Sequence, residues 1–122
     1  MKDRIYLASP TMHGEEQKYI QEAFDTNWVA PLGKNVDEFE KEMAAYVETG
    51  HGAALSSGTA ALHLAVKLAG IKPGDRVFCS DLTFSATVNP VSYEGGEQVF
   101  IESERETWNM DPQALRQAFE KY

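Results

Sequence analysis

The chain has 122 residues and a mass of 13.6 kDa, with 43% hydrophobic and 25% charged side chains. This composition is typical of one globular domain and excludes a disordered segment. Its single cysteine, Cys79, excludes an internal disulfide framework. Nineteen acidic residues against 11 basic ones give a net charge of −8 without a basic cluster, which argues against nucleic acid and anionic membranes as partners.

The first residues of the chain are of mixed polarity and contain no apolar segment of the signal-peptide kind. No stretch approaches the roughly 20 apolar residues that a membrane-spanning helix needs. The sequence therefore predicts a soluble, cytoplasmic protein.

Apolar residues at helical spacing predict two helices in the first part of the chain, at residues 15–24 and 36–47. The loop between them, residues 27–33, is unusually apolar because it contains Trp28, Val29 and Leu32. We expect residues 1–50 to form an N-terminal helical segment.

From residue 53 onward, short apolar runs alternate with helical patterns. Strands are predicted at residues 53–56, 77–80 and 98–101, and helices at residues 60–69 and 84–92 and from Pro112 onward. Gly70 is placed to cap the first of these helices, and Cys79 is expected to be a buried core thiol. This β-α-β-α-β-α order predicts an α/β fold with a parallel sheet. Because three strands are too few for a sheet covered on both faces, we expect the chain to be the first part of a larger domain.

The segment with the most chemical content is Ser57-Gly58-Thr59, where the first predicted strand passes into a helix. Free backbone N–H groups and the positive end of the helix dipole meet there, which suits a phosphate group. Serine and threonine also occur at such junctions simply as helix caps, so a capping role alone is the alternative. The segment has neither a Walker lysine nor a G-x-G-x-x-G pattern, which argues against a nucleoside triphosphatase and a dinucleotide fold.

Phe84 follows the next predicted strand, close to the crevice where α/β sheets bind ligands. Its ring can cover a flat cofactor there, or it can be a core residue at the start of a helix. Together, a phosphate site after one strand and an aromatic ring after the next indicate a phosphorylated aromatic cofactor.

Six stretches of the chain carry a family resemblance: residues 27–33, 36–40, 57–65, 73–77, 83–90 and 108–111. In this order, and over almost the whole chain, they resemble the DegT-type sugar aminotransferases, which are pyridoxal-phosphate enzymes of fold type I. The resemblance implies that the chain is the N-terminal part of the large domain of such an enzyme. Two helices would precede its β-α-β units, and residues 51–122 would be the first β-α-β-α-β portion of the cofactor-binding domain.

The resemblance also implies roles for individual residues. Gly58, Thr59 and Ala60 would hold the cofactor phosphate, chiefly through backbone amides, and Phe84 would stack on the pyridine ring. The apolar loop would contact the nucleotide-sugar through Asn27, Trp28, Val29 and Ala30.

The activity implied is amino-group transfer, with glutamate as the expected donor, to a UDP-linked 4-keto-6-deoxy N-acetylhexosamine. Such products would serve bacterial glycan or exopolysaccharide synthesis. Fold-type I enzymes build each active site from two subunits, so the whole protein is expected to be a homodimer.

The family's cofactor-binding lysine and its acidic partner lie downstream of the segment that this chain matches. None of the seven lysines present stands in a similar motif, so no catalytic residue is predicted here and the chain alone is expected to be inactive. Glu102 stands where the family usually has aspartate, and we interpret that position as structural.

The sequence leaves two alternatives to the aminotransferase function. The chain can be a non-catalytic domain that binds a phosphorylated ligand or regulates another protein. It can also belong to a sugar dehydratase of the same family, in which histidine replaces the lysine and the cofactor stays as pyridoxamine phosphate.

No metal site is predicted, because the three histidines share no ligand spacing. His13 lies in a loop, either solvated or in contact with substrate, His51 is a turn residue, and His63 is expected to lie on the exposed helix face with Lys67. Asp81 and Glu102, at strand ends, are expected to bond neighbouring loops and not to form a catalytic carboxylate pair.

Overall fold

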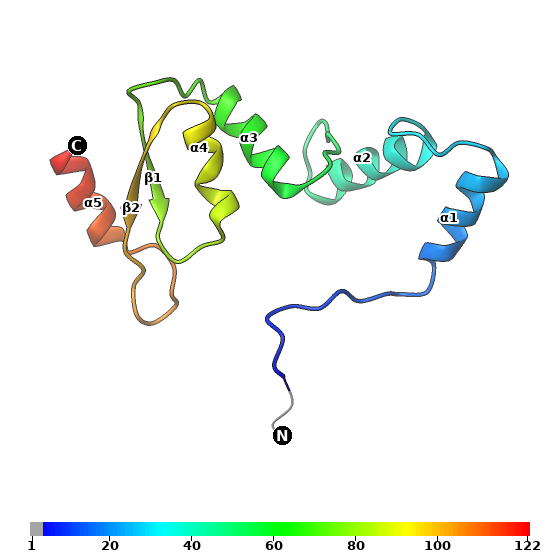
Figure 1. Ribbon diagram of the computed structural model, residues 1–122, viewed down its shortest axis with the longest axis horizontal. Coiled ribbons are helices and arrows are strands. Elements are labelled where there is room, and N and C mark those ends of the chain that lie inside the picture. The colour runs from blue at the N-terminus through cyan, green and yellow to red at the C-terminus, as the bar shows by residue number, and fades with distance from the viewer. Residues whose placement is uncertain (1–3) are drawn as a thin grey trace. The chain divides into compact units, whose positions relative to one another are not determined.

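The computed structural model describes residues 4–122 and divides the chain into two compact units, one ending at Ala54 and one spanning Leu55–Tyr122 (Figure 1). The predicted division after residue 50 stays a prediction. Within residues 4–122, no helix combines the length and apolar character needed to cross a bilayer.

The first unit contains two helices, α1 (Glu16–Asp25) and α2 (Lys34–Tyr46), joined by the apolar loop. Both predicted helices are confirmed, each with ends shifted by one or two residues. The Glu16 carboxylate accepts hydrogen bonds from the backbone N–H groups of His13 (2.7 Å) and Gly14 (2.8 Å). These bonds hold the pKa of Glu16 below its ordinary value, so a charged side chain marks the start of α1.

The strand predicted at residues 53–56 is wrong, because these residues form no ladder with any strand in the described part of the chain. The backbone N–H of Ala54 instead donates to the Glu40 carboxylate of α2 at 2.8 Å. Gly52 lies so close to α2 that a Cβ there would be 2.7 Å from the Glu40 carbonyl oxygen. The segment after α2 is therefore held by a helix and not by a neighbouring strand.

The second unit is built on two parallel strands, β1 (Arg76–Ser80) and β2 (Glu97–Ile101). Their register pairs Arg76 with Glu97 and Ser80 with Ile101. Helices α4 (Asn89–Tyr93) and α5 (Pro112–Lys121) both contact β2, and they lie on opposite sides of the sheet in Figure 1. The predicted α/β class with a parallel sheet is confirmed.

One long helix was expected at residues 84–92, but the structure has a 3-10 turn, η1 (Ser85–Thr87), followed by α4. Pro90 gives the physical reason. A proline in a continuous α-helix loses its N–H and clashes with the carbonyl four residues earlier, which here is that of Ala86. The helix therefore starts again at Asn89, with Pro90 in its first turn.

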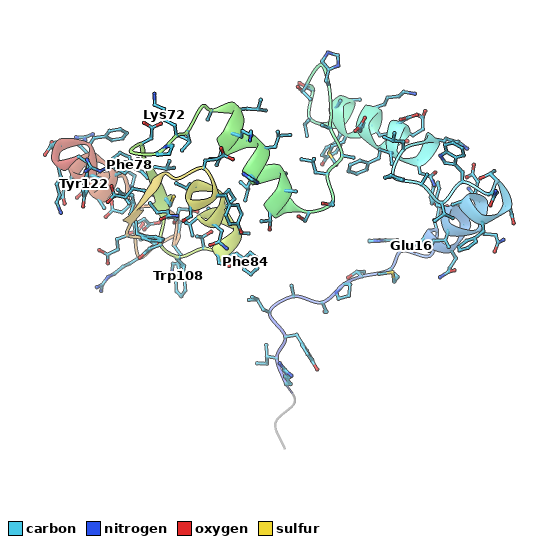
Figure 2. The ribbon with its side chains drawn as sticks, turned by 45° about the horizontal axis from the view of Figure 1, so that its top comes forward. Glu16, Lys72, Phe78, Phe84, Trp108 and Tyr122 are labelled. Atoms are coloured by element: carbon cyan, nitrogen blue, oxygen red, sulfur yellow. The ribbon has the colours of Figure 1, made fainter. Side chains whose placement is uncertain are left out.

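The core of the second unit is small, and its most buried side chain is Val91 of α4, with 1% of its surface exposed. Cys79 of β1 is also buried, as predicted, and burial raises the pKa of its thiol. On the α5 side, the rings of Phe78 and Phe119 pack edge to face with centroids 4.7 Å apart. Figure 2 shows Phe78 beside Tyr122 at the end of α5.

Candidate functional site

Helix α3 (Gly58–Leu68) begins at Ser57, which has extended backbone angles and caps the helix. Its Oγ accepts a hydrogen bond from the backbone N–H of Ala60 at 3.2 Å. The N–H groups of Gly58 and Thr59 have no acceptor within residues 4–122. Capping and anion binding are therefore compatible here, because the cap uses one amide and leaves two free.

The space around the missing side chain of Gly58 is open within residues 4–122. A Cβ built on Gly58 would meet no atom within 4 Å, and the backbone of Gly58 lies outside the left-handed region. Neither strain nor protein packing therefore requires glycine at this position. Two amides without an acceptor at the start of a helix fit a phosphate group.

Phe84 directly precedes η1, which packs against α3. Figure 2 shows it on the side of the second unit opposite Lys72. Its side chain is 77% exposed, so the interpretation of Phe84 as a core residue is wrong. An exposed ring next to a helix that contacts α3 is available to a ligand.

Asp81 lies where β1 ends, and its backbone N–H donates to the Ile101 carbonyl at 3.0 Å. Its carboxylate accepts a hydrogen bond from the Ser103 hydroxyl at 3.1 Å. The Glu102 carbonyl accepts from the N–H of Asp111 at 2.8 Å. Asp81 is thus bonded to a neighbouring loop through its carboxylate, as expected, whereas Glu102 is bonded through its backbone carbonyl, so the expectation for its carboxylate stays a prediction.

His63 is not exposed as predicted but partly buried between α3 and the end of α4. Its Nε2 lies 2.6 Å from a Glu94 carboxylate oxygen, and its ring meets that of Tyr93 edge-on at 5.2 Å. Lys67 shares this helix face, with Nζ 3.8 Å from the same Glu94 oxygen. The face was correctly identified as polar, and the end of α4 covers it in part, while the Lys67 side chain stays 67% exposed.

In the first unit, the apolar loop and the helix ends beside it enclose a cavity of about 510 Å³. Its walls are formed by Glu22, Ala23, Thr26, Trp28, Val29, Ala30, Leu32, Gly33, Lys34, Asn35 and Val36. Three of the four predicted substrate-contacting residues line it. Asn27 does not, and it has a left-handed backbone with φ of 53°.

Three further residues of this cavity were not predicted as functional. Glu22 and Lys34 form an ion pair of 2.5 Å, and Glu22 raises the pKa of Lys34. Gly33, the N-cap of α2, has φ of 137°. A glycine directly before a helix, with an aromatic residue a few positions earlier, was the signal available for Gly33. The sequence offered no signal for the ion pair, because Glu22 and Lys34 lie 12 residues apart.

Neither of the remaining histidines lines the cavity of the first unit. His13 is 82% exposed at its side chain and lies 3.7 Å from Glu16, and His51 is exposed. Among residues 4–122, no three or more His, Cys, Asp or Glu side chains are grouped so that they could hold a metal ion.

Residues 10–122 match the DegT/DnrJ/EryC1/StrS aminotransferase family. Over 121 residues the chain is 53% identical to EpsN of Bacillus subtilis (strain 168), which is named as a pyridoxal phosphate-dependent aminotransferase. The match covers 99% of this chain but 31% of that relative. The chain thus spans about a third of the length of the curated relatives it matches.

Two solved structures share the fold. A sugar aminotransferase from Streptococcus pneumoniae in its PLP form is 26% identical with a TM-score of 0.84, over 93% of this chain and 29% of that one. The GDP-4-keto-6-deoxy-D-mannose-3-dehydratase of E. coli, with bound hydrated PLP, is 27% identical with a TM-score of 0.80, over 92% of this chain and 30% of that one. The predicted fold-type I architecture is confirmed.

Proposed function

The chain belongs to the DegT/DnrJ/EryC1/StrS aminotransferase family, and we propose that the whole protein is a pyridoxal-phosphate-dependent aminotransferase acting on a nucleotide-linked keto-sugar. The observation that carries this proposal is the start of α3, where two amides have no acceptor within residues 4–122, together with the exposed Phe84, which directly precedes the turn that packs against α3. Pyridoxal phosphate, when bound, supplies an electron-withdrawing ring that lets an amino group pass from donor to acceptor.

Within this chain, the proposed work is binding and orientation. The N–H groups of Gly58 and Thr59 donate to the cofactor phosphate, and the α3 dipole favours its negative charge. Ala60 contributes less than the resemblance implied, because the Ser57 hydroxyl already accepts from its N–H. Phe84 covers the cofactor ring.

The substrate is proposed to bind at the apolar loop, through Asn27, Trp28, Val29 and Ala30. Trp28, Val29 and Ala30 line the cavity of the first unit. Asn27 would act through its backbone conformation, since it does not line that cavity.

For the finer specificity we propose a UDP-linked 4-keto-6-deoxy N-acetylhexosamine as acceptor and glutamate as donor, in bacterial glycan or exopolysaccharide synthesis. We also propose a cytoplasmic homodimer. No residue of this chain is assigned the role of the cofactor-binding lysine, so the 122 residues alone are proposed to be inactive.

The test is an amination assay with the purified whole protein, glutamate, and matched UDP- and GDP-linked 4-keto-6-deoxy sugars. We expect the visible absorbance of bound cofactor, and an amino-sugar product from the UDP-linked substrate, identified by mass. Turnover of the GDP-linked sugar alone would show that the substrate carries GDP and not UDP. Absence of both cofactor and turnover would contradict the function and favour a non-catalytic binding domain.

A dehydratase is the second candidate, because one of the two structural relatives described above is a 3-dehydratase of a GDP-linked keto-sugar. The same assay separates the two activities. A dehydratase product has lost a hydroxyl group, whereas an aminotransferase product has gained an amino group in place of the keto oxygen.

A further inference from the structure

The cavity of the first unit depends on a close approach between Trp28 and Gly33. A Cβ built on Gly33 would lie 2.2 Å from Nε1 and 2.6 Å from Cδ1 of the Trp28 ring. No ordinary side chain tolerates contacts this short, so the indole and a side chain at position 33 exclude each other. The φ of 137° at Gly33 separately disfavours any other residue.

The indole is also fixed by a hydrogen bond. Its Nε1 donates to the Leu32 carbonyl at 2.6 Å, so the ring is held against the backbone that leads into α2. Because indole has only this one donor, Trp28 has no N–H left for a ligand. The residue is nevertheless 59% exposed and lines the cavity, so its ring face and edge remain available.

We propose that Gly33 is a positioning residue for substrate binding, because it makes room for the Trp28 indole to form a fixed wall against which a ring of the substrate packs. This inference rests on the proposed function. The ligand chemistry is an apolar or aromatic ring face, which a nucleotide-sugar carries on both its base and its sugar. Trp28 recognises such a face by packing and not by hydrogen bonding.

The test uses the whole protein with Gly33→Ala. We expect the KM for the nucleotide-sugar to rise by about 2- to 13-fold, the range typical of a lost aromatic contact, while kcat and cofactor content stay unchanged. Gly74→Ala is the matched control. Gly74 has a similarly strained φ of 94°, but a Cβ there would meet no atom within 4 Å. An equal rise in KM for Gly74→Ala would overturn the proposal.

A double-mutant cycle asks whether Gly33 acts through Trp28. In a Trp28→Ala background, Gly33→Ala should cause no further rise in KM, because the ring that it displaces is gone. A rise of the same size in both backgrounds would show an independent role and would overturn the proposal.

Trp28→Phe keeps Gly33 and an aromatic ring but removes the donor to Leu32. If Gly33→Ala does not fold, an increased KM in Trp28→Phe supports the fixed ring and an unchanged KM opposes it.

A binding measurement separates failure of this inference from failure of the proposed function. The Trp28 emission is obtained as the difference between the protein and its Trp28→Phe variant, and it needs no turnover. Quenching by UDP alone would place the base against Trp28, and quenching only by the UDP-sugar would place the sugar ring there. If neither ligand changes this emission while turnover is normal, the inference is wrong and the proposed function stands.

Discussion

Gly58 and Gly33 differ in whether the surrounding residues require glycine. At Gly33 the requirement is internal, because a side chain would collide with the Trp28 ring. At Gly58 no atom of residues 4–122 lies within 4 Å of the missing Cβ, so packing within these residues does not require glycine there. Substitution at Gly58 therefore reports on ligand binding with little interference from folding.

We predict that Gly58→Val in the whole protein lowers cofactor occupancy while the Tm stays close to that of the parent. The valine side chain would occupy the open space that a phosphate needs to approach the amides of Gly58 and Thr59. Visible absorbance of the purified protein measures occupancy. Gly52→Val is the contrasting control, since a Cβ there meets the Glu40 carbonyl at 2.7 Å and should lower the Tm. Full occupancy in Gly58→Val would refute the phosphate assignment.

Phe84 gives a second residue-level test, because an exposed ring contributes little to folding. Stacking contributes about 0.5–1.5 kcal/mol beyond the area buried, so Phe84→Ala should weaken cofactor binding by at least about 2- to 13-fold. Phe84→Tyr and Phe84→Trp should bind nearly normally. Titration of the apo-protein with pyridoxal phosphate measures this. Equal affinities for the alanine and tryptophan variants would show that Phe84 does not stack on the ring.

At the scale of single elements, the stability of α5 depends on the residues at its start. Asp111 precedes it, and its carboxylate accepts from the N–H of Gln113 at 2.7 Å, while Pro112 occupies the position where no N–H is needed. Asp111→Ala should lower the free energy of unfolding by roughly 0.5–2 kcal/mol. Denaturant unfolding of the whole protein measures it. Asp111→Asn keeps an acceptor and should be much milder, and equal losses in both variants would contradict the capping role.

Cys79 in strand β1 should make the unfolding free energy depend on pH. Burial raises the pKa of this thiol above the 9.0 of an exposed cysteine, so the unfolded chain releases its proton first. The stability that this difference provides is complete below pH 9.0 and is lost as pH rises through the higher pKa of the folded state. We expect a steeper decrease in unfolding free energy above that pH than in a Cys79→Ala variant. Identical pH profiles would mean that the thiol titrates normally in the fold.

At the scale of the whole molecule, little apolar surface is covered within each unit. The first unit has one buried hydrophobic residue among those described, Ala44, while Phe24, Val29 and Leu32 are each at least 66% exposed. In the second unit, each strand pairs only with the other among residues 4–122, so both retain an unpaired edge. Exposed apolar patches and open strand edges usually mark interfaces.

We therefore predict that the 122-residue chain self-associates, that it shows no transaminase turnover, and that the whole protein is a homodimer. Sedimentation velocity at several concentrations measures association, and the keto-sugar assay measures turnover. A monodisperse monomer of the 122-residue chain at high concentration would contradict the interface argument. Measurable turnover by that chain would place a catalytic lysine within it.

The sequence alone determined α1, α2, α3 and α5, the two parallel strands, the cap at Gly70 and the burial of Cys79, because periodicity and turn residues act over a few positions. Gly70 does end α3, with φ of 79°. The sequence also predicted a phosphate site at the start of α3, since helix ends expose amides wherever they occur. Only the tertiary structure decided the rest. Residues 53–56 pair with no strand within residues 4–122, where the Ala54 amide donates to Glu40 instead, and His63 is partly buried because it meets Glu94, 31 positions away. The need for glycine at position 33 likewise comes from where the Trp28 indole lies, whereas the sequence offered only an aromatic residue a few positions before a glycine.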